Sequence, residues 1–231
     1  LRSTYGADGK LVEQVATLGG VLVFDKDFVA GVLAHQVATA LSGAAFEADY
    51  DAAGRVIRTV HPDGSVLETT YGADGKVAVT VKSGLIGQKY DTLRQSFDGQ
   101  GRLTEQVATL GGALVFDKDF VGGVLAHQVA TALDCAAFEA DYDATGRVIH
   151  AVHADGSVVD TTYGANGKIA STTKTGVSGQ KYDTLVSTYG ADGRLVGQVA
   201  TLGGALVFDR TFAAGVLAHQ ISTALNGAAY E

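Results

Sequence analysis

Residues 13–20 read Glu-Gln-Val-Ala-Thr-Leu-Gly-Gly, and the same eight residues return at 105–112. They return again at 197–204, where Gly197 replaces the glutamate. The chain therefore repeats every 92 residues, and repeats this similar usually stack as copies of one unit that cover each other's apolar faces. The predicted organisation is two full units and the first half of a third, at residues 1–92, 93–184 and 185–231. Because the chain starts and stops within this pattern, we expect a segment of a longer protein whose adjacent repeats are its partners.

The composition is that of a folded, acidic protein. With 231 residues, of which 46% are hydrophobic, the chain is long and apolar enough to bury a core. It has 31 glycines and a single proline, so we expect Gly, Asp and Asn to form its turns. The net charge of −8 argues against a nucleic-acid partner, because the sequence has no basic stripe to bind phosphates.

The single cysteine, Cys135, can form no disulfide within the chain. The equivalent positions of the other units are Gly43 and Gly227, so the thiol is not part of the repeated pattern. We interpret Cys135 as a substitution without a chemical role rather than as a nucleophile.

The first half of each unit is predicted to contain two strands and one helix. Leu11–Phe24 is rich in Val, Leu and Thr around Gly19 and Gly20, which favours two strands. Asp25 precedes the stretch Phe28–Leu41 and is predicted to cap a helix there. That stretch has apolar residues at a 3.6-residue period on one side and small residues on the other, so we expect a helix that is buried on both sides.

The second half of each unit is predicted to consist of β-hairpins. Two short strands flank the turn at Asp63 and Gly64, a further strand covers Ala78–Lys82, and Ser83–Thr92 forms a closing loop. The predicted fold class is therefore mainly β with one buried α-helix per unit. We expect this α+β tandem repeat to form an elongated or spiral array of antiparallel β-hairpins.

The second half of each unit resembles the YD repeat of Rhs proteins, polymorphic toxins and teneurins. That motif has a Tyr-Asp pair, a Gly-Arg a few residues later, a central Asp-Gly and a new Tyr after roughly twenty residues. Two copies match it: Tyr50-Asp51, Gly54-Arg55, Asp63-Gly64 and Tyr71, and then Tyr142-Asp143, Gly146-Arg147, Asp155-Gly156 and Tyr163. The resemblance covers about half of each unit, which the predicted helix interrupts. It implies a long β-sheet that spirals into a shell around a cargo, and it implies no catalytic residue.

A His-Gln pair recurs in all three units on the predicted helix. Its members are His35, Gln36, His127, Gln128, His219 and Gln220. Buried polar groups of this kind normally hydrogen-bond to neighbouring backbone, so we predict a structural role for them rather than a role as ligands or general bases.

Acidic residues also recur, and they are candidates for calcium ligands. The candidates are Asp25, Glu47, Asp49 and Asp51. Calcium takes six to eight oxygens, often from Asp-rich loops, but the sequence has neither EF-hand spacing nor a glycine-aspartate nonapeptide repeat. Turn-forming Asp is the favoured interpretation, calcium binding is the alternative, and no other cofactor is predicted.

Catalytic motifs are absent from the sequence. It contains no nucleophile elbow, zinc-binding pair or phosphate-binding glycine loop, and active sites rarely occur in tandem triplicate. We therefore predict that the chain is not an enzyme. Phe28–Phe46 is free of charge over 19 residues, close to transmembrane length, but His35 and Gln36 near its centre argue against membrane insertion.

These observations predict a structural tandem-repeat segment of a large secreted or cell-surface bacterial protein. Such a segment would act as a scaffold, a stalk or an encapsulating shell. Two alternatives stay open. One is a subunit of a self-assembling extracellular filament or other homo-oligomer, and the other is a calcium- or ligand-binding adhesin module.

Overall fold

The computed structural model describes residues 1–39, 45–131, 137–223 and 229–230. Cys135 lies outside the described residues, as do Gly43 and Gly227, so the interpretation of this thiol stays a prediction. The structure divides into two compact units, unit 1 (Leu1–Asp117) and unit 2 (Lys118–Glu231). The division between these units does not coincide with the end of the first sequence repeat at residue 92.

Every element in the described part of the chain is a β-strand. Unit 1 contains β1 (Arg2–Tyr5), β2 (Leu11–Leu18), β3 (Val21–Val29), β4 (Val32–Thr39), β5 (Ala45–Tyr50), β6 (Val56–Val60), β7 (Val66–Tyr71), β8 (Val77–Ser83), β9 (Thr92–Phe97), β10 (Leu103–Leu110) and the first part of β11 (Ala113–Val121). Unit 2 contains the rest of β11, β12 (Val124–Thr131), β13 (Ala137–Tyr142), β14 (Val148–Val152), β15 (Val158–Tyr163), β16 (Ile169–Thr175), β17 (Thr184–Tyr189), β18 (Leu195–Leu202), β19 (Ala205–Ala213), β20 (Val216–Thr223) and β21 (Ala229–Tyr230).

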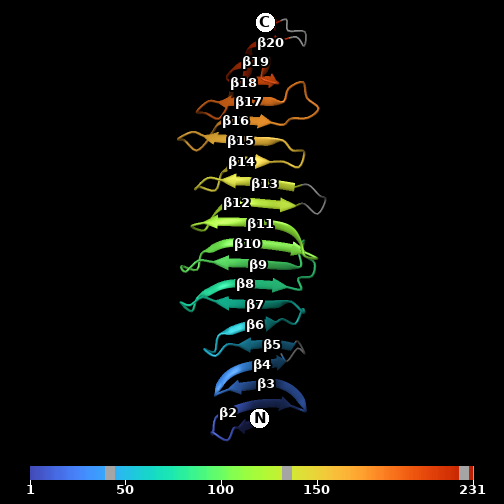
Figure 1. Ribbon diagram of the computed structural model, residues 1–231, viewed down its shortest axis with the longest axis vertical. Coiled ribbons are helices and arrows are strands. Elements are labelled where there is room, and N and C mark those ends of the chain that lie inside the picture. The colour runs from blue at the N-terminus through green and yellow to red at the C-terminus, as the bar shows by residue number, and fades with distance from the viewer. Residues whose placement is uncertain (40–44, 132–136, 224–228, 231) are drawn as a thin grey trace. The chain divides into compact units, whose positions relative to one another are not determined.

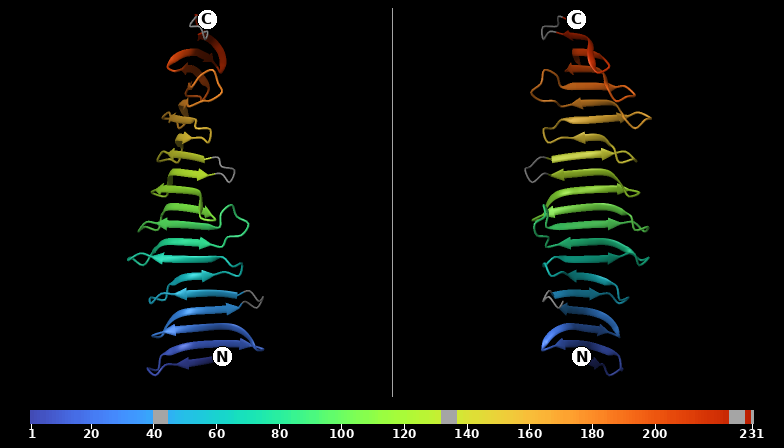
Figure 2. Two further views of the ribbon diagram at one scale, coloured as in Figure 1. Left: turned by 45° about the vertical axis from the view of Figure 1, so that its right-hand side comes forward. Right: turned by 180° about the vertical axis from the view of Figure 1, so that it is seen from behind.

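Within each unit the strands form an antiparallel meander in chain order. Each strand from β1 to β10 pairs with the next one in unit 1. The same is true from β12 to β21 in unit 2. Successive strands therefore lie side by side like rungs (Figure 1), and their connections alternate between the two ends of the strands (Figure 2).

One type of turn forms nine of the connections between strands in the described part of the chain. The N–H of its first residue donates to the carbonyl of the fifth, and the N–H of the fourth donates back to the carbonyl of the first, all at 2.8–2.9 Å. The fourth residue is always a glycine with φ between +76° and +85°, a conformation that other residues adopt only at a cost. Turns of this type begin at Gly6, Asp51, His61, Gly72, Asp98, Asp143, His153, Gly164 and Gly190.

The predicted helix over Phe28–Leu41 is wrong, and with it the α+β fold class and the helical insert. The described part of this stretch is the hairpin β3–β4, in which Ala30 (φ 52°) and Gly31 (φ 87°) form a two-residue turn. Two consecutive residues with positive φ match the twist of a hairpin and cannot lie inside a right-handed α-helix. Asp25, predicted as a helix cap, lies within β3 and pairs with Val15 and Val37.

The other repeats contain the information that contradicts a helix here. Gly122 and Gly123 stand where the first repeat has Ala30 and Gly31, and both have positive φ. A Gly-Gly pair in a helix interior costs about 1 kcal/mol per residue relative to alanine, whereas it is favoured at a hairpin turn. The apparent 3.6-residue period arose because valine, leucine and alanine occupy both faces of β4.

Small side chains occupy the best-buried positions of these sheets. The buried apolar residues are Ala48, Ala108, Ala140, Ala151 and Ala200, with exposed fractions of 0–6%. Larger apolar side chains next to the hairpin turns are open to water, as Val29 (69% exposed) and Val121 (74%) illustrate. The backbone hydrogen bonds of the meander and the cross-strand side-chain pairs therefore carry much of the stabilisation.

Substitutions at the β3–β4 and β11–β12 turns separate a hairpin from a helix. We expect Ala30→Gly to stabilise the protein by about 1 kcal/mol, because a non-glycine residue at positive φ costs about 1–2 kcal/mol. The matched reverse change, Gly122→Ala, should destabilise it by a similar amount, although a Cβ at this position has open space. Urea unfolding measures both. A helix would give the opposite signs, because glycine is the poorer helix former.

Candidate functional site

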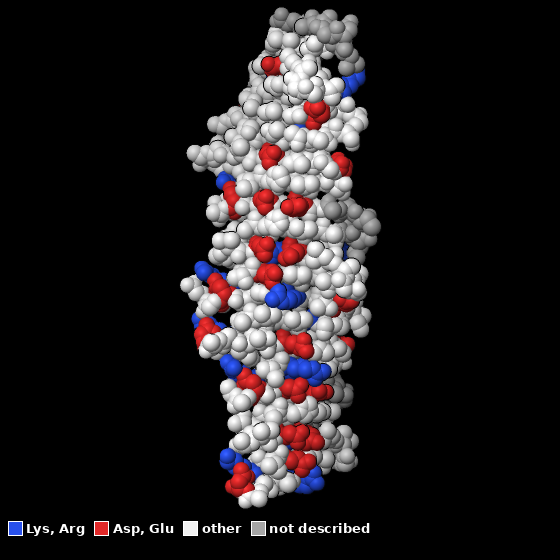
Figure 3. Space-filling view, viewed as in Figure 1, with Lys and Arg blue, Asp and Glu red and all other residues white. Residues whose placement is uncertain are grey.

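A row of charged and ionisable side chains crosses five strands of unit 1. Asp27 on β3, His35 on β4, Asp49 on β5, Arg58 on β6 and Glu68 on β7 are register partners in that order. Register partners share one face of a sheet, with Cβ atoms about 4.5–5.5 Å apart. We call this set the charged row. Acidic side chains with basic ones between them gather along the middle of the strands on the face that Figure 3 displays.

Three members of the charged row, His35, Asp49 and Arg58, are linked by direct contacts. Nδ1 of His35 lies 2.6 Å from Oδ1 of Asp49. Nη1 of Arg58 donates to Oε1 of Glu47 at 2.9 Å and to Oδ2 of Asp49 at 3.4 Å. The hydrogen bond to Glu47 is the main reason why the pKa of Arg58 is raised above its ordinary value. One cation therefore bridges the two carboxylates of β5, since Glu47 and Asp49 lie two residues apart on the same face.

Unit 2 has a corresponding row with one decisive difference, because His150 stands where unit 1 has Arg58. Nδ1 of His127 lies 2.7 Å from Oδ1 of Asp141, and Nδ1 of His150 lies 2.6 Å from Oδ1 of Asp160. Each hydrogen bond to a carboxylate raises the pKa of its imidazole above the usual 6.5. The row of unit 2 therefore gains positive charge on acidification, whereas Arg58 stays charged throughout.

The structure brings two of the four calcium candidates together. One ligand atom each of His35, Glu47 and Asp49 lies within 4.8 Å of the others. The guanidinium of Arg58 already bonds both carboxylates of this cluster. A calcium ion would therefore have to displace an arginine, and calcium binding stays a prediction.

The other two calcium candidates lie elsewhere. Asp25 lies within β3, and one of its carboxylate oxygens is buried without a hydrogen-bond partner among the described residues. Asp51 belongs to the turn between β5 and β6. Its Oδ1 accepts from the N–H groups of Ala53 and Arg55, both at 2.9 Å, and its Oδ2 accepts from Nε of Arg55 at 2.8 Å. The bonds from Arg55 and Ala53 lower the pKa of Asp51.

The aspartate turn continues into a tyrosine, and this chain of contacts explains the YD-like spacing. The guanidinium of Arg55 lies over the ring of Tyr71 at 4.4 Å, and the hydroxyl of Tyr71 donates to the carbonyl of Val56 at 2.8 Å. Asp51 therefore orders the turn, and Arg55 links the turn to the ring of Tyr71. The hydroxyl of Tyr71, at the end of β7, in turn bonds the backbone at the start of β6.

Further copies of the aspartate turn occur in the chain. In the second repeat, Asp143 bonds Arg147, whose guanidinium lies 4.3 Å from the ring centre of Tyr163. The turn between β9 and β10 has the same Asp98–Arg102 arrangement, with Nε of Arg102 donating to Oδ2 of Asp98 at 2.8 Å. The sequence interpretation missed this copy because a phenylalanine precedes Asp98 in place of tyrosine.

The repeated His-Gln pairs lie on strands, where neighbouring residues point to opposite faces. His35 belongs to the charged row, whereas Gln36 pairs in register with Lys26 and Ala48 on the other face. In the third repeat, Nε of Arg210 donates to Oε1 of Gln220 at 2.7 Å. The remaining members take these register partners: His127 with Asp141, Gln128 with Ala140 and His219 with Thr211. Their structural role stays a prediction.

A second recurring constellation joins the end of one repeat to the beginning of the next, and we call it the repeat clasp. At the end of the first repeat, the N–H of Asp91 donates to the carbonyl of Thr109 at 3.0 Å. Oδ2 of Asp91 accepts from the N–H of Gly111 at 2.8 Å, at the β10–β11 turn. The ring of Tyr90 meets that of Phe116 edge-on, with centres 5.8 Å apart.

The repeat clasp recurs at the end of the second repeat, within unit 2. Asp183 bonds the carbonyl of Thr201 at 3.0 Å through its N–H and the N–H of Gly203 at 2.7 Å through its carboxylate. The bond from Gly203 lowers the pKa of Asp183. Tyr182 packs edge-on against Phe208 at 5.9 Å. The sequence predicted a closing loop over Ser83–Thr92, and Tyr90 and Asp91 do lie between β8 and β9. Their contacts with the next repeat were missed, although the recurrence of the Tyr-Asp pair at the repeat ends was the available signal.

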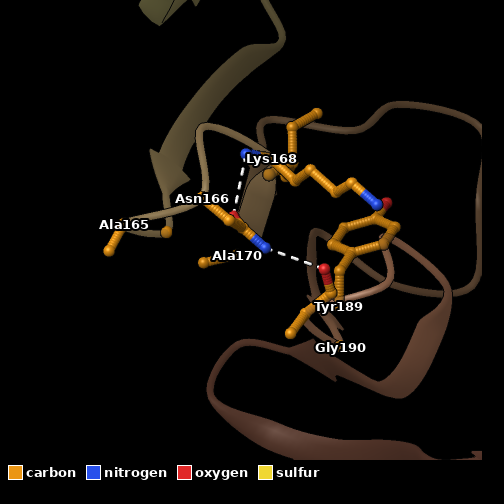
Figure 4. A pocket seen from close by; sticks show the side chains of 9 residues that line it. Ala165, Asn166, Lys168, Ala170, Tyr189 and Gly190 are labelled. Atoms are coloured by element: carbon orange, nitrogen blue, oxygen red, sulfur yellow. Dashed lines mark hydrogen bonds between the residues drawn. The ribbon is translucent and has the colours of Figure 1, made fainter.

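An open pocket of about 370 Å³ lies between two turns of unit 2 (Figure 4). Nδ2 of Asn166 donates to the carbonyl of Ala191 at 2.7 Å across it, and Nζ of Lys168 donates to the carbonyl of Asp192 at 2.8 Å. Its lining is formed by Gly164, Ala165, Asn166, Lys168, Ile169, Ala170, Tyr189, Gly190 and Ala191. Of these residues, Lys168 and Tyr189 can ionise.

Comparisons with known proteins find similarity among solved structures. No protein-family model matches the chain, and no curated protein matches it. The chain is similar to part of a TcdB2–TccC3–Cdc42 complex, with 14% identity and a TM-score of 0.28 over 96% of this chain and 13% of that one. It is also similar to part of the Photorhabdus luminescens Tc holotoxin pore, with 13% identity and a TM-score of 0.27 over 98% of this chain. The chain spans 13% of the length of each of these solved chains.

Among the described residues there is no helix that is long and apolar enough to span a membrane.

The two histidine–carboxylate pairs of unit 2 should make the stability of the fold depend on pH. Because the pKa values of His127 and His150 are raised in the folded state, both pairs stabilise the fold below about pH 6.5, and that stability is lost as the pH rises through the raised values. We expect a loss of at most about 1 kcal/mol per pair, because both pairs are solvent-exposed.

Urea unfolding in metal-free buffer between about pH 6 and 8 measures this loss. His150→Arg should remove the part of this pH-dependent loss of stability that comes from His150, because a guanidinium keeps its charge over this range. An unchanged pH profile in that variant would contradict the assignment.

Proposed function

We propose that this chain is a structural tandem-repeat segment of the YD type, whose repeats build a scaffold or wall within a larger secreted or surface-exposed bacterial protein. In this proposal the chain holds or encloses other parts of that protein and does not itself catalyse a reaction. The repeat clasp is the observation that carries the proposal. It uses residues from two successive repeats, so it couples each repeat to its neighbour.

The use of the motif residues also supports this function. Asp51, Arg55 and Tyr71 direct their polar atoms at the turn, at each other and at backbone groups. The same holds for their second-repeat counterparts. Groups that are committed to backbone and side-chain partners in this way serve to order hairpins.

The repeat clasp can be tested by removing its aromatic pair. We expect Tyr90→Leu to lower the free energy of unfolding by about 1 kcal/mol, because edge-to-face aromatic pairs contribute about 0.5–1.5 kcal/mol beyond their buried area. Hydrogen exchange should show faster exchange in β10 and β11 as well as in the loop that contains Tyr90. The control is Tyr5→Leu at a tyrosine that is 64% exposed, which should change little.

The outcome that would contradict the proposal is faster exchange in the Tyr90 loop alone. The clasp would then anchor its own loop without coupling one repeat to the next. Tyr182→Leu repeats the experiment at the second clasp, where the same pattern of faster exchange is expected.

A further inference from the structure

We propose that unit 2 carries a binding site for a divalent transition-metal ion, best matched by zinc, formed by His127, Asp141 and His150 with Glu139 beside them. This inference is independent of the scaffold function. It concerns the position at which unit 1 has Arg58 and unit 2 has His150.

The register of unit 2 places these residues next to one another on three adjacent strands. His127 on β12 pairs with Asp141 on β13, and Asp141 pairs with His150 on β14. The three residues therefore stand in a line on one face of the sheet, with a carboxylate between two imidazoles. Glu139 lies two residues from Asp141 on the same strand and so shares that face.

The first repeat marks where a cation sits in this arrangement. Nη1 of Arg58 lies 2.9 Å from Oε1 of Glu47 and 3.4 Å from Oδ2 of Asp49. The second repeat retains both carboxylates as Glu139 and Asp141 but replaces the arginine with a histidine. A metal ion can take the place of the guanidinium nitrogen, and the new imidazole can ligate that ion.

The strand spacing suits a shared ion. Adjacent strands lie about 4.8 Å apart, so the backbones of His127 and His150 are roughly 10 Å apart across β13. With Zn–N bonds of about 2.0–2.1 Å, the two imidazoles can reach one ion above Asp141 by side-chain rotation alone. Nδ1 of His127 lies 2.7 Å from Oδ1 of Asp141, and metal binding would replace this contact with a bond from each group to the ion.

The outer contacts also have the arrangement expected around a ligated metal. Nδ1 of His150 lies 2.6 Å from Oδ1 of Asp160, which leaves Nε2 of the ring as the nitrogen that can ligate an ion. Histidines that bind metals usually carry such a carboxylate or carbonyl partner on the second ring nitrogen, because the partner fixes the tautomer and orients the ring.

The donor set selects the class of metal. Two imidazoles with one or two carboxylates favour zinc and its first-row neighbours, whereas calcium and magnesium prefer sites made of oxygen alone. The first repeat has the carboxylates and His35, but its arginine occupies the cation position. One site per chain is therefore expected, in the second repeat.

The two repeats provide a reciprocal experiment. Calorimetric titration with zinc chloride should give one equivalent for the unaltered chain and none for His150→Arg. Arg58→His should create a second site and give two equivalents. The double variant, with both changes, should return to one equivalent, now in the first repeat. Asp160→Asn should weaken zinc binding by roughly 10–100-fold, because Asp160 orients His150.

Controls separate loss of the site from loss of the fold. Arginine is already accommodated at the equivalent position of the first repeat, so zinc-free His150→Arg should melt at or above the temperature of the unaltered chain. Zinc should raise the melting temperature of the unaltered chain and leave that of His150→Arg unchanged. His153→Ala removes a histidine of the neighbouring turn and should leave one equivalent.

The decisive result is the stoichiometry of the two single changes. Zinc binding that survives His150→Arg would overturn the proposal, because it would come from other carboxylates and imidazoles on the surface. An Arg58→His variant that folds but gains no second equivalent would overturn it as well.

Discussion

Positive backbone φ at the turns is the constraint on which the rest of this structure depends. Each strand of the meander must reverse after a few residues, and the reversal places one or two residues in a left-handed conformation that glycine adopts at little cost. Glycine at the fourth position of the common turn aligns the following strand, and the register of that strand then determines which side chains meet. The charged row, the aspartate turns and the repeat clasp all follow from these reversals.

Part of this arrangement could be predicted from the sequence. The 92-residue period, the Gly19-Gly20 break and the Asp-Gly hairpins of the second half were recognised because glycine and aspartate have specific roles in turns. The β3–β4 hairpin was missed because alanine stands at its first turn position, where glycine would have signalled a reversal. Aligning Ala30 with Gly122 would have replaced the predicted helix with a hairpin. The Gly122-Gly123 pair of the second repeat is typical of a turn, and equivalent residues of two repeats adopt the same conformation.

The candidate site was harder to predict because it depends on pairing between strands. Glu47 and Asp49 were chosen for their charge, and the structure places them together with His35 and Arg58. Arg58 drew no attention in the sequence, because its importance comes from lying opposite Asp49 on a neighbouring strand. On a helix, His35 and Gln36 would have been neighbours on one surface. On β4 they face opposite sides of the sheet, and only the histidine reaches the carboxylates.

The repeat clasp also bears on how such a chain can change in length over evolution. Each clasp takes its residues from two adjacent repeats, so duplication or loss of a whole 92-residue unit by recombination preserves every joint. An insertion of any other length between Asp91 and Gly111 would separate these two residues and break the contact between them. Genes for proteins of this kind should therefore vary by whole units, and the similarity of the copies, with Glu13 to Gly20 repeated unchanged at 105–112, is compatible with that mode of growth.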